Sequence, residues 1–197
     1  MNSLPISWIV VAGVLLIALL VVAAWLLSRR RKQSLRLQQR FGPEYNRTVD
    51  ELGGRAKAES ELKARELRVE RLNIMPLAAS EAARFSQAWS TLQSRFVDNP
   101  KGVVMQADQL VRELMLKRGY PMGDFERRAA DISVDHPTVV ETYRAAQAIA
   151  IRDHRGEANT EDLRQAVVYY RALFDELLEV TEAKQEVLAA KPLPAHA

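Results

Sequence analysis

The feature that most constrains this chain is an uncharged, strongly apolar stretch of 22 residues near its N-terminus. Residues 6–27 contain 14 Leu, Ile or Val side chains and no Asp, Glu, Lys or Arg. As an α-helix this stretch is about 33 Å long, which matches a bilayer hydrocarbon core of roughly 30 Å. We therefore predict a transmembrane helix at 6–27. Trp8 and Trp25 are expected to anchor it at the two membrane interfaces, where indole rings are enriched.

Two other interpretations of this stretch are a buried core helix and a cleaved signal peptide. Its length and its place at the start of the chain argue against a core helix. A signal peptide has a basic start, an apolar run of roughly 7–15 residues and an A-x-A-like cleavage site. Residues 1–5 contain no Lys or Arg, the run is longer than that, and no A-x-A occurs near its end. We therefore expect a retained single-pass anchor.

A basic cluster follows the apolar stretch directly and predicts its orientation. It consists of Arg29, Arg30, Arg31, Lys32 and, one turn later, Arg36. Positive charge accumulates on the cytoplasmic side of membrane helices, so we expect the N-terminus outside and the remaining chain in the cytoplasm. The cluster either serves this orientation alone or also contacts anionic lipid head groups. In the second case each cation contributes about 1 kcal/mol.

The distribution of charge argues against nucleic acid as a partner. The net charge of +3 divides into +6 for residues 28–75 (13 Lys+Arg, 7 Asp+Glu) and −3 for residues 76–197 (15 and 18). Binding to phosphates requires Lys and Arg clustered on the folded surface, and the predicted folded part is acidic. The absence of Cys excludes disulfides and thiol chemistry, and no phosphate-binding glycine motif occurs. We predict no cofactor and no metal.

Residues 28–75 are expected to form a basic juxtamembrane segment and a charged helical stem. Gly53 and Gly54 predict a bend within it, since glycine is a poor helix former. The apolar stripes of this segment are narrow and predict either a coiled-coil contact or packing on the chain's own downstream part. Three i,i+4 pairs are expected to support the helix: Glu51–Arg55, Glu59–Lys63 and Glu61–Arg65.

Residues 76–190 read as an all-α bundle of about four main helices, and residues 191–197 as a disordered tail. Apolar residues recur at helical spacing, and no segment has a competing strand pattern. Caps or N1 prolines are expected to start the helices, and glycines to end two of them. The expected starts are Ser80, Asn99-Pro100, Asp124, His136-Pro137 and Thr160, and the expected glycine ends are Gly119 and Gly156.

The densest polar segment of the sequence holds the candidates for catalysis. Asp131, Asp135 and His136 together form a carboxylate–histidine set of the kind used in acid–base catalysis or metal binding. Their spacing does not match the Glu-x-x-His or His-Glu-x-x-His patterns of helical metal sites. The other interpretation is structural, with Ser133 or Asp135 capping a helix that begins at Pro137. We therefore assign no catalytic residue from the sequence.

Four short motifs carry a resemblance to a family. They are the segments 40–45 (RFGPEY), 124–126 (DFE), 129–137 (AADISVDHP) and 143–144 (YR). With them, residues 40–180 resemble an uncharacterised family of bacterial single-pass membrane-anchored proteins. The resemblance implies a bacterial setting, with the anchor in the inner (cytoplasmic) membrane. It implies no activity and no catalytic residues.

These features lead to one main hypothesis about function and two alternatives. The main hypothesis is a membrane-tethered helical interaction or scaffold module, with the lipid bilayer and a protein bound to the bundle as its partners. One alternative is a small membrane-associated hydrolase or metal-dependent enzyme that uses Asp131, Asp135 and His136. The other is a scaffold that self-associates through the stem. The sequence leaves the oligomeric state open.

Overall fold

The computed structural model describes the backbone of residues 6–189, and the side chains of residues 15–178 apart from Leu26 and Arg30. Eight helices and no strand occur in this part of the chain, which confirms the all-α prediction. The chain divides into two compact units, residues 1–40 and 41–197, and each is described by itself. The predicted tail at 191–197 lies outside the described residues.

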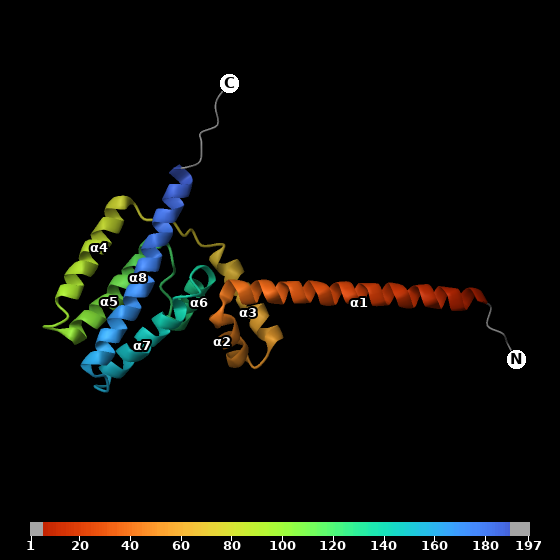
Figure 1. Cartoon of the computed structure of the whole chain (residues 1–197), viewed down its shortest axis with the longest axis horizontal. Coiled ribbons are helices and arrows are strands. Elements are labelled where there is room, and N and C mark those ends of the chain that lie inside the picture. The colour runs from red at the N-terminus through yellow and green to blue at the C-terminus, as the bar shows by residue number, and fades with distance from the viewer. Residues whose placement is uncertain (1–5, 190–197) are drawn as a thin grey trace, which may run out of the picture. The chain divides into compact units, whose positions relative to one another are not determined.

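The first unit is one long helix, α1 (Ile6–Phe41), which ends in the first residue of the second unit (Figure 1). Its described large apolar side chains between residues 15 and 27 are each exposed to more than half of their surface. Within the described residues, no helix carries an apolar run long enough to reach across a bilayer. Residues 6–14 of the predicted span, and with them the Trp8 side chain, lie outside the described side chains.

The second unit contains a bundle of five helices. They are α4 (Ala79–Ser94), α5 (Pro100–Arg118), α6 (Phe125–Asp135), α7 (Val140–His154) and α8 (Thr160–Ala189). Helix α8 packs along both α5 and α7, and α4 packs on α5 (Figure 1). Aromatic rings fill the middle of this core. Trp89 lies 4.7 Å from Phe174 between ring centroids, and Tyr143 lies 6.3 Å from Tyr170.

Local chemistry sets several of the helix ends. The side chain of Asn99 accepts a hydrogen bond from the Gly102 amide at 3.0 Å, and Pro100 occupies the first turn of α5, as predicted. Asn159 and Asp162 exchange hydrogen bonds at the start of α8. This capping box makes Asn159 the cap, where the sequence had indicated Thr160.

The start of α4 also differs from the sequence prediction. Helix α4 begins at Ala79 after Ala78, whose side chain has no hydrogen-bonding group, so the predicted cap at Ser80 is wrong. Ser80 lies within the first turn instead. For α4, the apolar periodicity therefore predicts the helix better than the candidate cap residue does.

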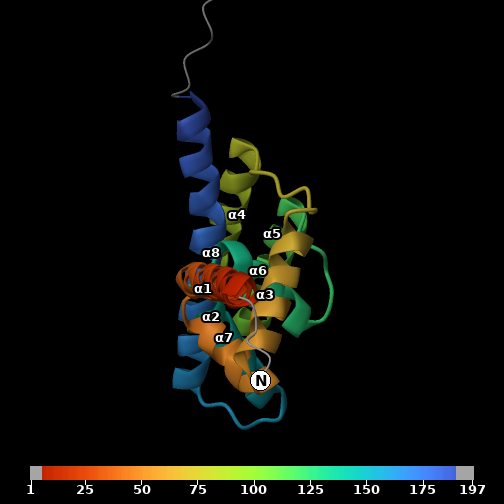
Figure 2. The same ribbon diagram turned by 90° about the vertical axis from the view of Figure 1, so that its right-hand side faces the viewer.

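Residues 43–69 form a hairpin of two helices, α2 (Pro43–Leu52) and α3 (Arg55–Val69). The predicted bend is present, because Gly53 ends α2 with a left-handed φ of 66°. The Glu61–Arg65 pair is confirmed at 3.1 Å, whereas Glu51 pairs with Arg47. Helix α3 packs on α6, and α2 contacts α7 (Figure 2). Of the two expectations for this segment, the structure shows packing on the downstream helices.

Gly119 at the end of α5 generates the first testable prediction. Its φ is +97°, and a Cβ at this position would lie 2.4 Å from the Asn73 carbonyl oxygen. We expect Gly119→Ala to lower the free energy of unfolding by about 3 kcal/mol, because backbone strain and a clash with main-chain atoms combine. Equilibrium urea unfolding followed by circular dichroism measures this loss.

Gly156 provides the matched control. Its φ is also positive, at +74°, but a Cβ there meets no atom within 4 Å. Gly156→Ala is expected to cost only about 1 kcal/mol, the strain of the left-handed conformation alone. Equal losses for the two variants would contradict the close approach of the Asn73 carbonyl to Gly119.

Candidate functional site

The carboxylate candidates of α6 are held by partners within the protein. Asp131 is fully buried, and its Oδ1 accepts a hydrogen bond from Arg68 Nε of α3 at 2.7 Å. Asp135, one turn later, accepts a hydrogen bond from the Tyr120 hydroxyl at 3.4 Å. The two carboxylates share a face of α6 but are bound to different parts of the chain.

The histidine of this segment turns toward another helix. His136 is 1% exposed, and its Nδ1 lies 3.2 Å from Glu176 Oε1 of α8. The structure thus directs Asp131, Asp135 and His136 toward three separate partners on α3, the α5–α6 loop and α8. Among the described residues, no three His, Asp or Glu side chains form a group suited to a metal ion.

The capping interpretation of this segment is wrong. Helix α6 continues to Asp135, and α7 begins only at Val140, after a cap residue without a side-chain hydrogen bond. The Ser133 hydroxyl donates to the Ala130 carbonyl within α6 at 2.7 Å. Pro137 therefore does not start a helix. It follows the end of one, because the residue before a proline is disfavoured in the α conformation.

Burial dominates the electrostatics around His136. It lowers the pKa of the imidazole below 6.5, against the opposing hydrogen bond with Glu176, and the nearby Arg118 guanidinium lowers it further. Burial also raises the pKa of the Tyr120 hydroxyl, as does the Asp135 carboxylate. His136 is therefore neutral at pH 7 and Tyr120 keeps its proton. Both act as neutral hydrogen-bonding groups inside the fold.

A second buried charged cluster lies between the hairpin and α7. Glu44 of α2 is fully buried, and its Oε1 accepts hydrogen bonds from Arg65 of α3 at 2.9 Å and from Arg144 of α7 at 3.1 Å. Arg144 also forms an ion pair with Glu126 of α6. No local pattern in the sequence predicts this cluster, because the Glu44–Arg144 pair spans 100 residues.

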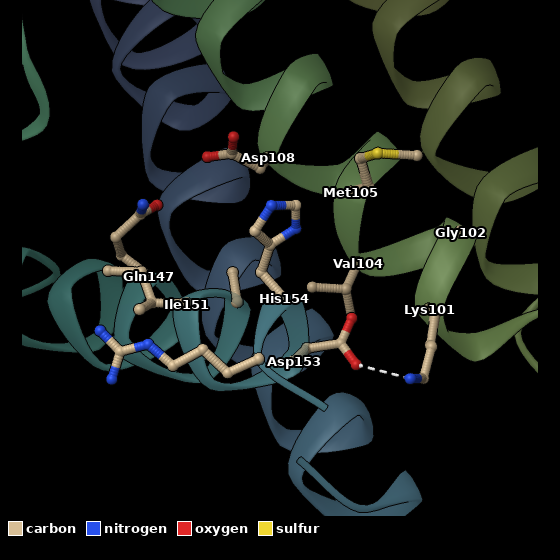
Figure 3. Close-up of a pocket in the computed structure, with 11 residues that line it drawn as sticks. Lys101, Gly102, Val104, Met105, Asp108, Gln147, Ile151, Asp153 and His154 are labelled. Carbon is tan, nitrogen blue, oxygen red and sulfur yellow. Dashed lines mark ion pairs between the residues drawn. The ribbon is translucent and has the colours of Figure 1, made fainter. Parts of the chain in front are cut away.

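A pocket of about 590 Å³ opens between α5 and α7 (Figure 3). Val104, Met105 and Ile151 provide its larger apolar side chains, and Met105 is 68% exposed. An ion pair between Lys101 Nζ and Asp153 Oδ1, at 3.4 Å, lies at one side. A volume of this size with apolar walls and a few polar groups is typical of a binding site.

On its polar side, this pocket is linked to the core of the bundle by a hydrogen bond. Asp108 and Gln147 line it, and Gln147 accepts a hydrogen bond from the buried Tyr170 hydroxyl at 3.4 Å. In Figure 3 the His154 ring rises from α7 toward the Asp108 and Met105 side chains of α5. The helical spacing of Lys101, Met105 and Asp108 indicates one shared face of α5, but it does not indicate the α7 side of the pocket.

The described part of the basic cluster forms a stripe on α1. The spacing of Trp25, Arg29, Lys32 and Arg36 is 4, 3 and 4 residues, which brings them onto one helix face, and Arg31 lies elsewhere on the helix. The Arg29 guanidinium stacks over the Trp25 ring at 3.7 Å from its centroid. The side chain of Arg30 lies outside the described residues. Trp25 and Arg29 thus mark the boundary between the apolar and basic parts of α1.

In comparisons with known proteins, no family model, no curated protein and no solved structure matches this chain.

The buried imidazole predicts a specific dependence of stability on pH. The folded pKa of His136 is lower than 6.5, so the unfolded chain binds more protons as the pH falls through 6.5. The contribution of His136 to the free energy of unfolding is complete above pH 6.5 and is lost as the pH falls below it. The free energy of unfolding then changes by at most about 1.4 kcal/mol per pH unit. Urea unfolding between pH 5 and 8 measures this slope. His136→Gln is expected to reduce it.

His154→Gln serves as the control for this experiment, because His154 is exposed at the end of α7. This variant should keep the wild-type slope. If His136→Gln and the wild-type protein lose stability equally on acidification, protonation of the buried imidazole is not the cause.

Proposed function

We propose that this protein is a membrane-tethered interaction module, in which α1 anchors the chain and the helical bundle binds a protein partner. The exposed apolar surface of α1 carries this proposal. Leu15, Leu16 and Val21 point to different sides of the helix, and each is exposed to more than half of its surface. A helix that is apolar on all sides requires a protein core or a lipid environment around it. A lipid bilayer provides that environment.

The order of side chains along α1 supports an orientation for this anchor. Exposed leucines are followed by Trp25 and then by the Arg29 guanidinium stacked on it. An indole at the interface and arginines beyond it are typical of the cytoplasmic end of a membrane helix. In the proposed arrangement Arg29, Lys32 and Arg36 face anionic head groups of the inner membrane, and the bundle lies in the cytoplasm.

The pocket between α5 and α7 supports the second half of the proposal. Its exposed apolar residues, Met105 and Ile151, are flanked by the Lys101–Asp153 ion pair and by Gln147. Protein interfaces combine such an apolar centre with a polar rim. We assign this pocket to an apolar side chain of a protein partner.

The membrane anchor is tested by arginines in the apolar part of α1. Leu16→Arg combined with Leu20→Arg opposes insertion by about 6 kcal/mol, since each arginine near the bilayer centre costs about 3 kcal/mol. We expect most of this variant to leave the membrane fraction during alkaline carbonate extraction, whereas the wild-type protein stays in it.

Leu35→Arg is the matched control, because Leu35 is also an exposed leucine of α1, at 56%, but lies beyond the predicted span. This variant should stay with the membrane. Extraction of the wild-type protein by carbonate, or equal retention of the doubly substituted chain, would contradict the anchor.

Site-specific photocrosslinking in cells tests the pocket. A benzoylphenylalanine in place of Ile151 is expected to give a discrete adduct with another protein, because this position lines the pocket and is 45% exposed. The same probe in place of Val97, which is 89% exposed between α4 and α5, should not give that adduct. The same adducts at both positions, or none at Ile151, would contradict a partner in the pocket.

A further inference from the structure

No described apolar side chain of the α2–α3 hairpin belongs to the core of the bundle. This core consists of side chains from residue 74 onward. The hairpin's buried apolar residues, among them Tyr45, Ala58 and Leu62, lie outside that core. The hairpin is therefore not held by an extension of the bundle core.

Two ion pairs, each with a buried carboxylate and a partly exposed arginine, connect the hairpin to the bundle. Arg144 Nη2 of α7 donates to Glu44 Oε1 of α2 at 3.1 Å, and Arg68 Nε of α3 donates to Asp131 Oδ1 of α6 at 2.7 Å. Both carboxylates are fully buried. We call these two contacts the latch pairs. A third pair, Arg47–Glu126, is longer, at 3.9 Å, and its glutamate is exposed.

Because it depends on buried charges, the contact between the hairpin and the bundle is specific, and yet the hairpin can leave the bundle at a moderate cost in free energy. The attraction between buried charges is strong, but it is offset by the cost of removing both charges from water. When the whole hairpin leaves the bundle, both charged side chains of each pair are hydrated again, and this desolvation cost is recovered. Loss of one partner within the docked hairpin leaves the other charge buried and unpaired, which is much less favourable.

The chain at both ends of the hairpin permits such a movement. Gly42, just before α2, has a left-handed φ of 49°. After α3, residues 70–78 form no helix. Within this segment the Met75 amide donates to the Arg118 carbonyl at 2.9 Å, so its far end stays bound to the bundle. The hairpin lies between these two points.

We propose that the α2–α3 hairpin is a detachable latch that the Glu44–Arg144 and Arg68–Asp131 pairs hold on α6 and α7, and that it opens as one body while α4–α8 stay folded. Opening uncovers the face of α6 and α7 that carries Asp131 and Arg144. This device does not depend on the identity of the partner or on the membrane anchor.

Two adjacent alanines of α6 allow a direct test. Ala129 belongs to the bundle core, whereas Ala130 is buried outside that core and lines a hollow with Arg65 and Arg68 of the hairpin. Since the chain has no cysteine, Ala129→Cys and Ala130→Cys each introduce a single thiol. The rate of labelling by a thiol reagent, measured on the full chain in detergent micelles and normalised to the unfolded chain, reports opening at each site.

We expect Ala130→Cys to be labelled at least tenfold faster than Ala129→Cys. Adding Arg144→Met should accelerate labelling at position 130 at least tenfold further and leave position 129 unchanged. Arg164→Met removes an exposed ion pair with Glu161 on α8 and should change neither rate. Equal acceleration at both positions, or none at position 130, would overturn the latch.

A measurement without Arg144→Met keeps the proposal testable if that variant does not fold. In graded urea below the unfolding transition, labelling at position 130 should rise less steeply than at position 129, because opening of the hairpin exposes less surface than opening of the bundle. Identical urea dependence at the two positions would show that hairpin and bundle open together, and would overturn the proposal.

Discussion

The burial of the apolar face of α8 against α5 and α7 is the contact on which the rest of the bundle depends. Tyr170 and Phe174 of α8 are fully buried, and Phe174 packs against Trp89 of α4. Buried aromatic side chains each remove roughly 150–250 Å² from water. Helix α8 thereby holds together helices that are far apart in the sequence. The α5–α7 pocket is formed by the two helices on which α8 packs. The Tyr170 hydroxyl of α8 donates a hydrogen bond to Gln147, which lines this pocket.

A different kind of contact holds the α2–α3 hairpin. Burial of the Glu44 carboxylate is compensated by ion pairs with Arg65 and Arg144, and by a longer one with Arg47. Removal of one member of such a pair typically costs about 3–5 kcal/mol, although the pair as a whole adds little net stability. Two kinds of packing therefore occur within residues 41–197. The core of the bundle is apolar and continuous, whereas the contact between the hairpin and the bundle depends on specific charged pairs.

The polar segment that ends α6 shows where local interpretation fails. Asp131, Asp135 and His136 are neighbours in sequence, yet their partners are Arg68, Tyr120 and Glu176, at separations of 63, 15 and 40 residues. A pattern of nearby residues predicts shared chemistry only when their side chains face one point. Here Asp131 faces α3, whereas His136, whose backbone leaves the helix at φ −130°, faces α8.

The all-α class, the bend at Gly53 and the ends of α5 at Asn99 and Gly119 follow from the sequence, because short-range hydrogen bonds and backbone preferences act over a few residues. Which helices meet, and which charges are buried, follows only from the tertiary structure. The Glu44–Arg144 pair and the α5–α7 pocket exist because packing of apolar faces brings distant segments together, and no local pattern encodes the partner of a buried charge.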